Sequence, residues 1–171
     1  LLEPSKDDGT SDDEGVLQTW RAMCPELQEW WPEDEQPEDW EGVTIENGRV
    51  VKLKLENFGL TGAVPADIGQ LTSLTKLNLN RNQLTSLPAE LGQLTSLTRL
   101  DLFGNQLTSV PAEIGQLTSL EGLDLRYNQL TSVPAEIGQL ASLRKLSLGG
   151  NQLTSVPAEI GQLTSLKCLD L

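Results

Sequence analysis

The sequence contains no histidine and only two cysteines, Cys24 and Cys168, which stand near opposite ends of its 171 residues. Histidine is the side chain whose charge changes most readily near neutral pH and the commonest metal ligand, so its absence removes the usual general acid or base of an active site. Two cysteines at this separation form neither a zinc motif nor a disulfide framework. We therefore expect a protein that is not an enzyme and that holds no metal ion or cofactor.

Long hydrophobic runs are also missing. No stretch reaches the roughly 18 apolar residues of a membrane-spanning helix, and the first residues, LLEPSKDDGTSDDE, do not have the shape of a signal peptide. Because the chain does not start with methionine and its last residues, LKCLDL, stop within a repeat, we expect it to be a fragment of a longer protein. Residues 1–10 are expected to be disordered because of their polar, charged composition.

Basic residues are scarce only in the N-terminal part of the chain. Residues 1–48 contain fifteen acidic residues against two basic ones, so this segment alone accounts for the formal net charge of −13. Residues 49–171 contain ten acidic and ten basic residues and are neutral. The acidity therefore belongs to the N-terminal segment and does not indicate what the rest of the chain binds.

The rest of the chain repeats one motif. NQLTSVPAEIGQL begins at Asn105, Asn128 and Asn151, and a close copy, NQLTSLPAELGQL, begins at Asn82. Equivalent leucines stand at positions 74, 97, 120, 143 and 166, a spacing of 23 residues. A fixed period of this length is typical of a solenoid, in which each repeat forms one coil and packs against the coils before and after it.

Each repeat is expected to form a short strand followed by a short helix or turn. The strand part, L-x-x-L-x-L-x-x-N, alternates, so its leucines face inward and the intervening residues face outward. In the second part, Pro111 suits the first position of a helical turn, and Glu113 suits its first turn because of the helix dipole. Asn105 and its equivalents would point inward and bond backbone groups of the adjoining turns.

Residues 11–48 have a different pattern, which we interpret as an N-terminal cap. Ser11 and Glu14 have the spacing of a helix capping box, and Asn47-Gly48 predicts a hairpin turn between two apolar stretches. We expect the four tryptophans to cover the apolar end of the first coil, since an uncapped solenoid exposes its core; an aromatic binding patch is the alternative. They are Trp20, Trp30, Trp31 and Trp40.

The pattern of residues 40–171 resembles that of leucine-rich repeat proteins. The resemblance implies an α/β fold: a right-handed solenoid with a parallel β-sheet on its concave face, short helices or turns on its convex face, and an N-terminal helix and hairpin cap. Residues 49–171 would then form five repeats and a partial sixth. The 23-residue unit is similar to intracellular Ras-scaffold and plant Ras-group-related repeat proteins, which implies a small GTPase or another signalling protein as partner. NQLTSVP also resembles a segment of the lamprey variable lymphocyte receptors.

The first repeat and the cap resemble plant-type repeats instead. Residues 60–69, LTGAVPADIG, include one residue more than later repeats, and Phe58 stands where those repeats have asparagine. DWEGVTIENG is similar to the plant-type cap C-x-W-x-G-V-x-C, but Glu38 and Ile45 occupy its cysteine positions. Because this cap disulfide is absent, we expect a cytoplasmic rather than an extracellular location.

The repeats differ from one another mainly at the outward-facing strand positions, and we expect these positions to form a binding surface on the concave face. Phe103 and Tyr127 are expected to be exposed beside arginines, which is the composition of an interface hot spot. The residues predicted to bind a partner are Lys76, Asn78, Arg81, Arg99, Asp101, Phe103, Asp124, Arg126, Tyr127 and Lys145.

Three other functions fit these residues less well. Asp101 and Asp124 should lie on adjacent strands, about 5 Å apart, like the carboxylate pair of a glycosidase or part of a calcium site. A packed solenoid offers no deep pocket, however, and Arg99 and Arg126 are near enough to neutralise the pair. The basic positions could follow the phosphates of a nucleic acid, but the aspartates beside them oppose this.

We therefore predict a monomeric, non-enzymatic scaffold that binds a protein partner on its concave face in signal transduction. One alternative is the recognition domain of a larger signalling protein, a receptor or an intracellular kinase, that continues beyond Leu171. A further alternative is a surface that binds carbohydrate or nucleic acid.

Overall fold

The computed structural model describes residues 12–171, and its first element is helix α1, Asp13–Met23. Asp12 is the N-cap of this helix, and its Oδ1 accepts a hydrogen bond of 2.8 Å from the backbone N–H of Gly15. The predicted capping box is therefore wrong in register, because Gly15 and not Glu14 occupies the position that Asp12 caps. Ser11 lies outside the described residues, as do residues 1–10, for which disorder was predicted. The cap continues with α2, Leu27–Trp30, and a 3₁₀ turn, η1, Pro37–Asp39.

Aromatic stacking holds the cap together. The rings of Trp31 and Trp40 are stacked with centroids 5.0 Å apart, and Trp20 meets Trp31 edge-on at 6.2 Å. These three tryptophans are buried, as predicted. Trp30 differs: it is 41% exposed and lies against Phe58, with ring centroids 4.7 Å apart. Phe58, at the position where later repeats have asparagine, thus packs against the cap.

A buried carboxylate joins the cap to the first strand of the solenoid. Asp13 is 1% exposed, and its Oδ2 accepts hydrogen bonds from the backbone N–H of Val50 at 2.8 Å and from Arg49 Nε at 3.1 Å. Strands β1, Val43–Glu46, and β2, Arg49–Lys54, form the predicted antiparallel hairpin. Its turn residues Asn47 and Gly48 have φ angles of 52° and 73°, the left-handed conformations that a tight hairpin turn requires.

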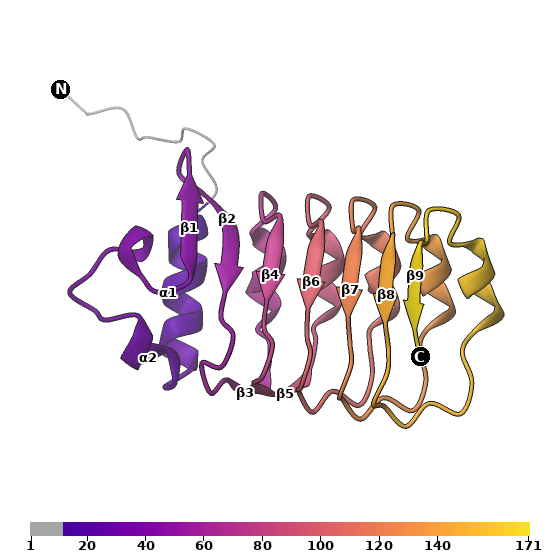
Figure 1. Ribbon diagram of the computed structural model, residues 1–171. Helices are drawn as coiled ribbons and strands as arrows, with labels where there is room; N and C mark the ends of the chain where they lie inside the picture. Colours follow the sequence, from indigo (N-terminus) through magenta and orange to yellow (C-terminus); the bar gives the residue numbers. More distant parts are fainter. Residues whose placement is uncertain (1–11) are drawn as a thin grey trace.

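Strand β2 also pairs with β4, and from β2 onward all neighbouring strands of the main sheet are parallel. The strand order is β1-β2-β4-β6-β7-β8-β9, so the coils follow one another along the sheet in sequence order (Figure 1). The bounds are Lys76–Asn78 for β4, Arg99–Asp101 for β6, Gly122–Asp124 for β7, Lys145–Ser147 for β8 and Cys168–Asp170 for β9. Each strand therefore pairs with the residues one repeat further on, as the period predicts.

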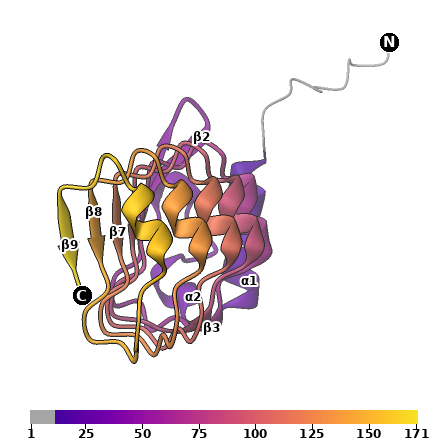
Figure 2. The ribbon, with the colours of Figure 1, turned by 90° about the vertical axis from the view of Figure 1, so that its right-hand side faces the viewer.

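Short 3₁₀ turns form the convex face, on the side opposite to the strands (Figure 2). Their bounds are Ala66–Gln70 for η2, Ala89–Gln93 for η3, Ala112–Gln116 for η4, Ala135–Gln139 for η5 and Ala158–Gln162 for η6. The proline of each repeat, for example Pro111, stands just before the turn and not within it. A small second sheet pairs β3, Thr61–Ala63, with β5, Gln83–Ser86, in parallel.

The core lies between these two faces and is formed mainly by the repeated leucines. Leu74, Leu97, Leu120 and Leu143 are fully buried. Asparagines satisfy the backbone at the corner of each coil, as predicted: Asn105 donates from Nδ2 to the carbonyls of Leu79 (2.9 Å) and Leu102 (3.2 Å) and accepts from the N–H of Leu84 (3.1 Å). Asn82, Asn128 and Asn151 make equivalent bonds. The architecture is the predicted right-handed leucine-rich-repeat solenoid.

Candidate functional site on the concave face

The strand register brings six of the predicted site residues together in two rows across the concave face, which consists of the outward-facing side chains of β2, β4 and β6–β9. Lys76, Arg99, Gly122 and Lys145 are register partners on neighbouring strands and form the first row. The second row is formed by Asn78, Asp101, Asp124 and Ser147. Because each strand contributes one residue to each row, the differences between repeats meet on one surface.

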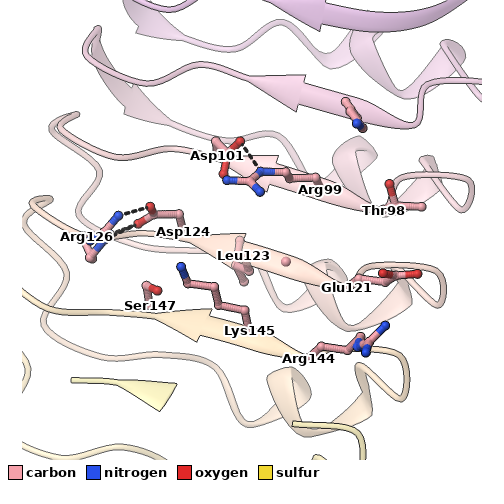
Figure 3. Close-up of a pocket in the computed structure, with 12 residues that line it drawn as sticks. Thr98, Arg99, Asp101, Glu121, Leu123, Asp124, Arg126, Arg144, Lys145 and Ser147 are labelled. Carbon is pink, nitrogen blue, oxygen red and sulfur yellow. Dashed lines mark hydrogen bonds and ion pairs between the residues drawn. The ribbon is translucent and has the colours of Figure 1, made fainter. Parts of the chain in front are cut away.

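Ion pairs hold two arginines against the aspartates of the second row (Figure 3). Arg99 donates from Nε to Asp101 Oδ2 at 2.7 Å, and Arg126 donates from Nε and Nη2 to the two oxygens of Asp124 at 3.0 and 2.6 Å. The hydrogen bond and the charge of the neighbouring aspartate raise the pKa of each arginine. The predicted aspartate pair is therefore neutralised by the two arginines, and the surface presents fixed guanidinium groups in place of a free carboxylate pair.

The aromatic residues of the prediction form a cluster with arginines at the ends of the strands. The rings of Phe103 and Tyr127 meet edge-on with centroids 5.3 Å apart. The guanidinium carbons of Arg126 and Arg81 lie 5.3 and 5.8 Å from the Phe103 centroid, within the range of cation–π attraction. Tyr127 is 61% exposed, as expected, but Phe103 is only partly exposed because its three neighbours pack around the ring. We call Arg81, Phe103, Arg126 and Tyr127 the aromatic cluster.

Two members of the aromatic cluster have a left-handed backbone. Arg81 and Tyr127 have φ angles of 55° and 54°, at the repeat position where Gly104 and Gly150 have φ angles of 67° and 72°. A side chain at such a φ costs on the order of 1 kcal/mol relative to glycine. Arg81 and Tyr127 thus occupy a position at which glycine would be the less strained choice, and strain of this kind tends to gather at functional sites.

Beside the aromatic cluster lies a hollow of about 370 Å³ over strands β6–β8. Six predicted residues line it: Lys76, Arg99, Asp101, Asp124, Arg126 and Lys145. Residues that the prediction missed are Thr98, Glu121, Gly122, Leu123, Arg144 and Ser147. The position just before each strand also varies between repeats, with Thr98, Glu121 and Arg144 as equivalents, and this variation could have identified them. Asn78 does not line the hollow; its Oδ1 accepts a bond from the N–H of Asn80.

Comparison with known proteins identifies the family. The sequence profile described as Leucine rich repeat matches residues 49–107, 104–153 and 118–171. These matches cover all of the repeats and more than half of the chain, so the chain belongs to the leucine-rich repeat family. This fold is typically a binding domain without catalytic residues of its own, and the similarity indicates protein–protein recognition.

Plant receptor kinases and their ectodomains are among the similar proteins. LRR receptor-like serine/threonine-protein kinase FEI 2 of Arabidopsis thaliana is 40% identical over 57 residues, which are 32% of this chain and 10% of that kinase. The ectodomain of the plant membrane receptor kinase GASSHO1/SCHENGEN3 from Arabidopsis thaliana, solved in complex with CASPARIAN STRIP INTEGRITY FACTOR 2, has a TM-score of 0.83 at 32% identity over 92% of this chain and 20% of that one. A chain of the BIR3–SERK2 complex from Arabidopsis thaliana has a TM-score of 0.75 at 29% identity over 95% of both chains. The chain spans 5–13% of the length of the curated relatives it matches.

These similarities overturn two expectations. A small GTPase was expected as partner, and a cytoplasmic location was expected because the cap lacks its cysteines. The similar structures instead include ectodomains of plant receptor kinases, one of them solved in complex with CASPARIAN STRIP INTEGRITY FACTOR 2. The inference from the cysteines failed because the stacked Trp31 and Trp40 and the buried Asp13 hold this cap in place of a disulfide. A missing disulfide therefore does not indicate a reducing compartment here.

Proposed function

We propose that the chain is the extracellular recognition domain of a receptor-kinase type of signalling protein, and that it binds a peptide or a partner ectodomain on its concave face. The similarity to plant receptor ectodomains over nearly the whole chain supports this reading over that of a separate intracellular scaffold. Within residues 12–171, no helix is long and apolar enough to cross a membrane.

The main support for the proposal is that the repeats differ on the concave face and hardly at all on the convex face. The convex turns repeat almost unchanged, with Glu113 and Glu136 in equivalent places, whereas the concave face gathers the aromatic cluster and the paired arginines. A partner that binds the convex face would meet nearly the same surface on every coil, and its position along the solenoid would not be fixed. The aromatic cluster is a single feature at which a partner can be held in one position, and aromatic residues and arginine are the usual anchors of interfaces.

Selection of peptides from a displayed random library on the immobilised chain tests the proposal. A parallel selection uses the double variant Phe103→Ala/Tyr127→Ala, with its fold checked by circular dichroism, and the matched convex control is Glu113→Lys/Glu136→Lys. Peptides enriched on the unmodified chain should bind the convex variant normally and lose binding to the aromatic variant. Peptides that bind the aromatic variant normally but not the convex one would place recognition on the convex face and contradict the proposal.

A further inference from the structure

One position in the first row of the concave face has no side chain. The row contains Lys76, Arg99 and Lys145, and Gly122 stands between Arg99 and Lys145 as the register partner of both. Glycine within a strand costs about 0.5–1 kcal/mol and often marks a place where a ligand approaches the backbone. The presence of glycine at position 122 therefore requires a physical explanation.

Neither backbone conformation nor packing requires glycine at position 122. Its φ is not in the left-handed region, and a Cβ built there would meet only the Cγ of Arg99, at an ordinary contact distance of 3.9 Å. Gly115 on the convex face is the contrasting case, because a Cβ there would lie 2.5 Å from the carbonyl oxygen of Glu136. Gly122 is thus not needed for packing, and its effect is to keep the hollow open.

The groups around this opening have surplus positive charge. Lys76, Arg99, Arg126, Arg144 and Lys145 line the hollow against Asp101, Glu121 and Asp124. Arg99 and Arg126 are paired with aspartates, whereas the side chain of Lys145 makes no ion pair or hydrogen bond within residues 12–171. Lys145 is the register partner of Gly122 on β8, and Figure 3 shows its ammonium group on the side towards Asp124.

Arg99 is held in place on the other side of the opening. Its Nε is bonded to Asp101, which is only 8% exposed, so the guanidinium is fixed while its Nη atoms make no hydrogen bond to the described part of the chain. Arg99 and Lys145 stand on strands two apart, which places their backbones about 10 Å from each other. Both side chains are long, so a small anion between them can make charge-assisted hydrogen bonds of about 2.8 Å to each.

We propose that the hollow over Gly122 is an anion subsite, in which Arg99 and Lys145 hold an acidic group of the partner, a carboxylate or a sulfate or phosphate ester. Asp101 is a positioning residue that orients Arg99. The subsite rests on the proposed function, because it takes the partner to lie on the concave face. It adds the chemistry by which one part of that partner is recognised.

The first test introduces a carboxylate into the hollow by substitution of Gly122. Gly122→Glu and Gly122→Gln introduce side chains of nearly the same size and shape that differ in charge. Gly122→Glu should melt at a higher temperature than Gly122→Gln, and the difference should fall by half or more when Lys145→Gln is added to both. Lys52 on β2 is the register partner of Lys76 and lies outside the hollow. Combination with Lys52→Gln should therefore leave the difference unchanged. A carboxylate variant that melts no higher than its amide partner overturns the subsite.

The second test uses small anions and identifies the source of the acidic group. Sodium acetate and sodium sulfate are titrated at constant ionic strength while the backbone amide signals of β6–β8 are followed by NMR. The Gly122 signal should shift to saturation, with the dissociation constant at least fivefold weaker in Lys145→Gln and unchanged in Lys52→Gln. Tighter acetate binding assigns the subsite to a carboxylate, and tighter sulfate binding assigns it to an ester. No saturable shift with either anion overturns the proposal.

Neither test requires a partner. Their failure therefore removes the anion subsite and leaves concave-face recognition standing. Failure of the peptide selection contradicts the proposed function instead, and it does so whether or not the small anions bind in the hollow.

Discussion

The ring of Tyr127 lies against Gly150 of the next coil, so closely that a Cβ at position 150 would come within 2.8 Å of Tyr127 Cδ1. One pair of coils earlier the contact is looser, because a Cβ built at Gly104 would meet Arg81 at an ordinary contact distance of 3.8 Å. Large residue and glycine thus alternate along this column. Gly150 leaves room for the ring of Tyr127, whereas a side chain at position 104 would meet Arg81 without a clash.

Gly150→Ala should disturb the aromatic cluster, and Gly59→Ala is its matched control. Both glycines have φ near 70°, so alanine costs on the order of 1 kcal/mol at either position. Only Gly150 has a neighbour, because nothing lies within 4 Å of a Cβ at Gly59. Urea denaturation should therefore show a larger loss of stability for Gly150→Ala. Equal losses would show that the Tyr127 ring moves aside freely.

Replacement of Tyr127 tests whether its backbone is strained. Tyr127→Ala and Tyr127→Gly both remove the ring, but only glycine relieves the left-handed conformation at φ 54°. The free energy of unfolding of Tyr127→Gly should exceed that of Tyr127→Ala by about 0.5–1 kcal/mol. In an ordinary strand or turn alanine is the better of the two, so a more stable Tyr127→Ala would refute the strain.

The glycines of the convex turns allow neighbouring coils to pack closely, and Gly115→Ala tests this role. A Cβ at Gly115 would lie 2.5 Å from the carbonyl oxygen of Glu136, so the two coils must move apart, at a cost of about 1–3 kcal/mol. Gly161 occupies the equivalent position in the last convex turn and has nothing within 4 Å. Gly161→Ala should change stability by no more than about 0.5 kcal/mol. Thermal melts of the two variants measure the contrast, and similar melting temperatures would contradict it.

Removing one asparagine should destabilise the solenoid strongly. Asn128 donates to the carbonyls of Leu102 and Leu125 and accepts from the N–H of Leu107, all in the core. Asn128→Ala leaves these backbone groups without a partner, and the expected loss is about 2–4 kcal/mol by urea denaturation. Its exposed neighbour Gln129 is the control, since Gln129→Ala should cost less than about 0.5 kcal/mol.

Much of the solenoid follows from the sequence because the period fixes it. The spacing of 23 residues determines which residues become register partners. The rows that contain Arg99 and Asp101 could therefore be predicted from the sequence alone. The same spacing placed the asparagines at the coil corners. The hairpin at Asn47-Gly48 was predictable from local turn chemistry alone.

Features that depend on single contacts could not be predicted in this way. The start of α1 shifted by one residue because Asp12 caps as well as Ser11 can. The partial burial of Phe103 depends on which rotamers Arg81 and Arg126 adopt, and a repeat pattern does not specify these. The hollow was missed because its defining residue, Gly122, has no side chain. The prediction of the cellular location was wrong because it rested on the missing cysteine pair. The absence of these cysteines does not reveal that stacked tryptophans stabilise the cap instead.

The most direct test of concave-face recognition is calorimetry of one selected peptide against four single variants. Phe103→Ala and Tyr127→Ala should each weaken binding by at least about 1–2 kcal/mol, the size expected for an interface anchor. Glu113→Lys and Glu136→Lys, on the convex face, should leave the dissociation constant within about twofold. Thermal melts of the same samples separate loss of binding from loss of folding. If the convex variants abolish binding while Phe103→Ala and Tyr127→Ala bind normally, recognition does not take place on the concave face.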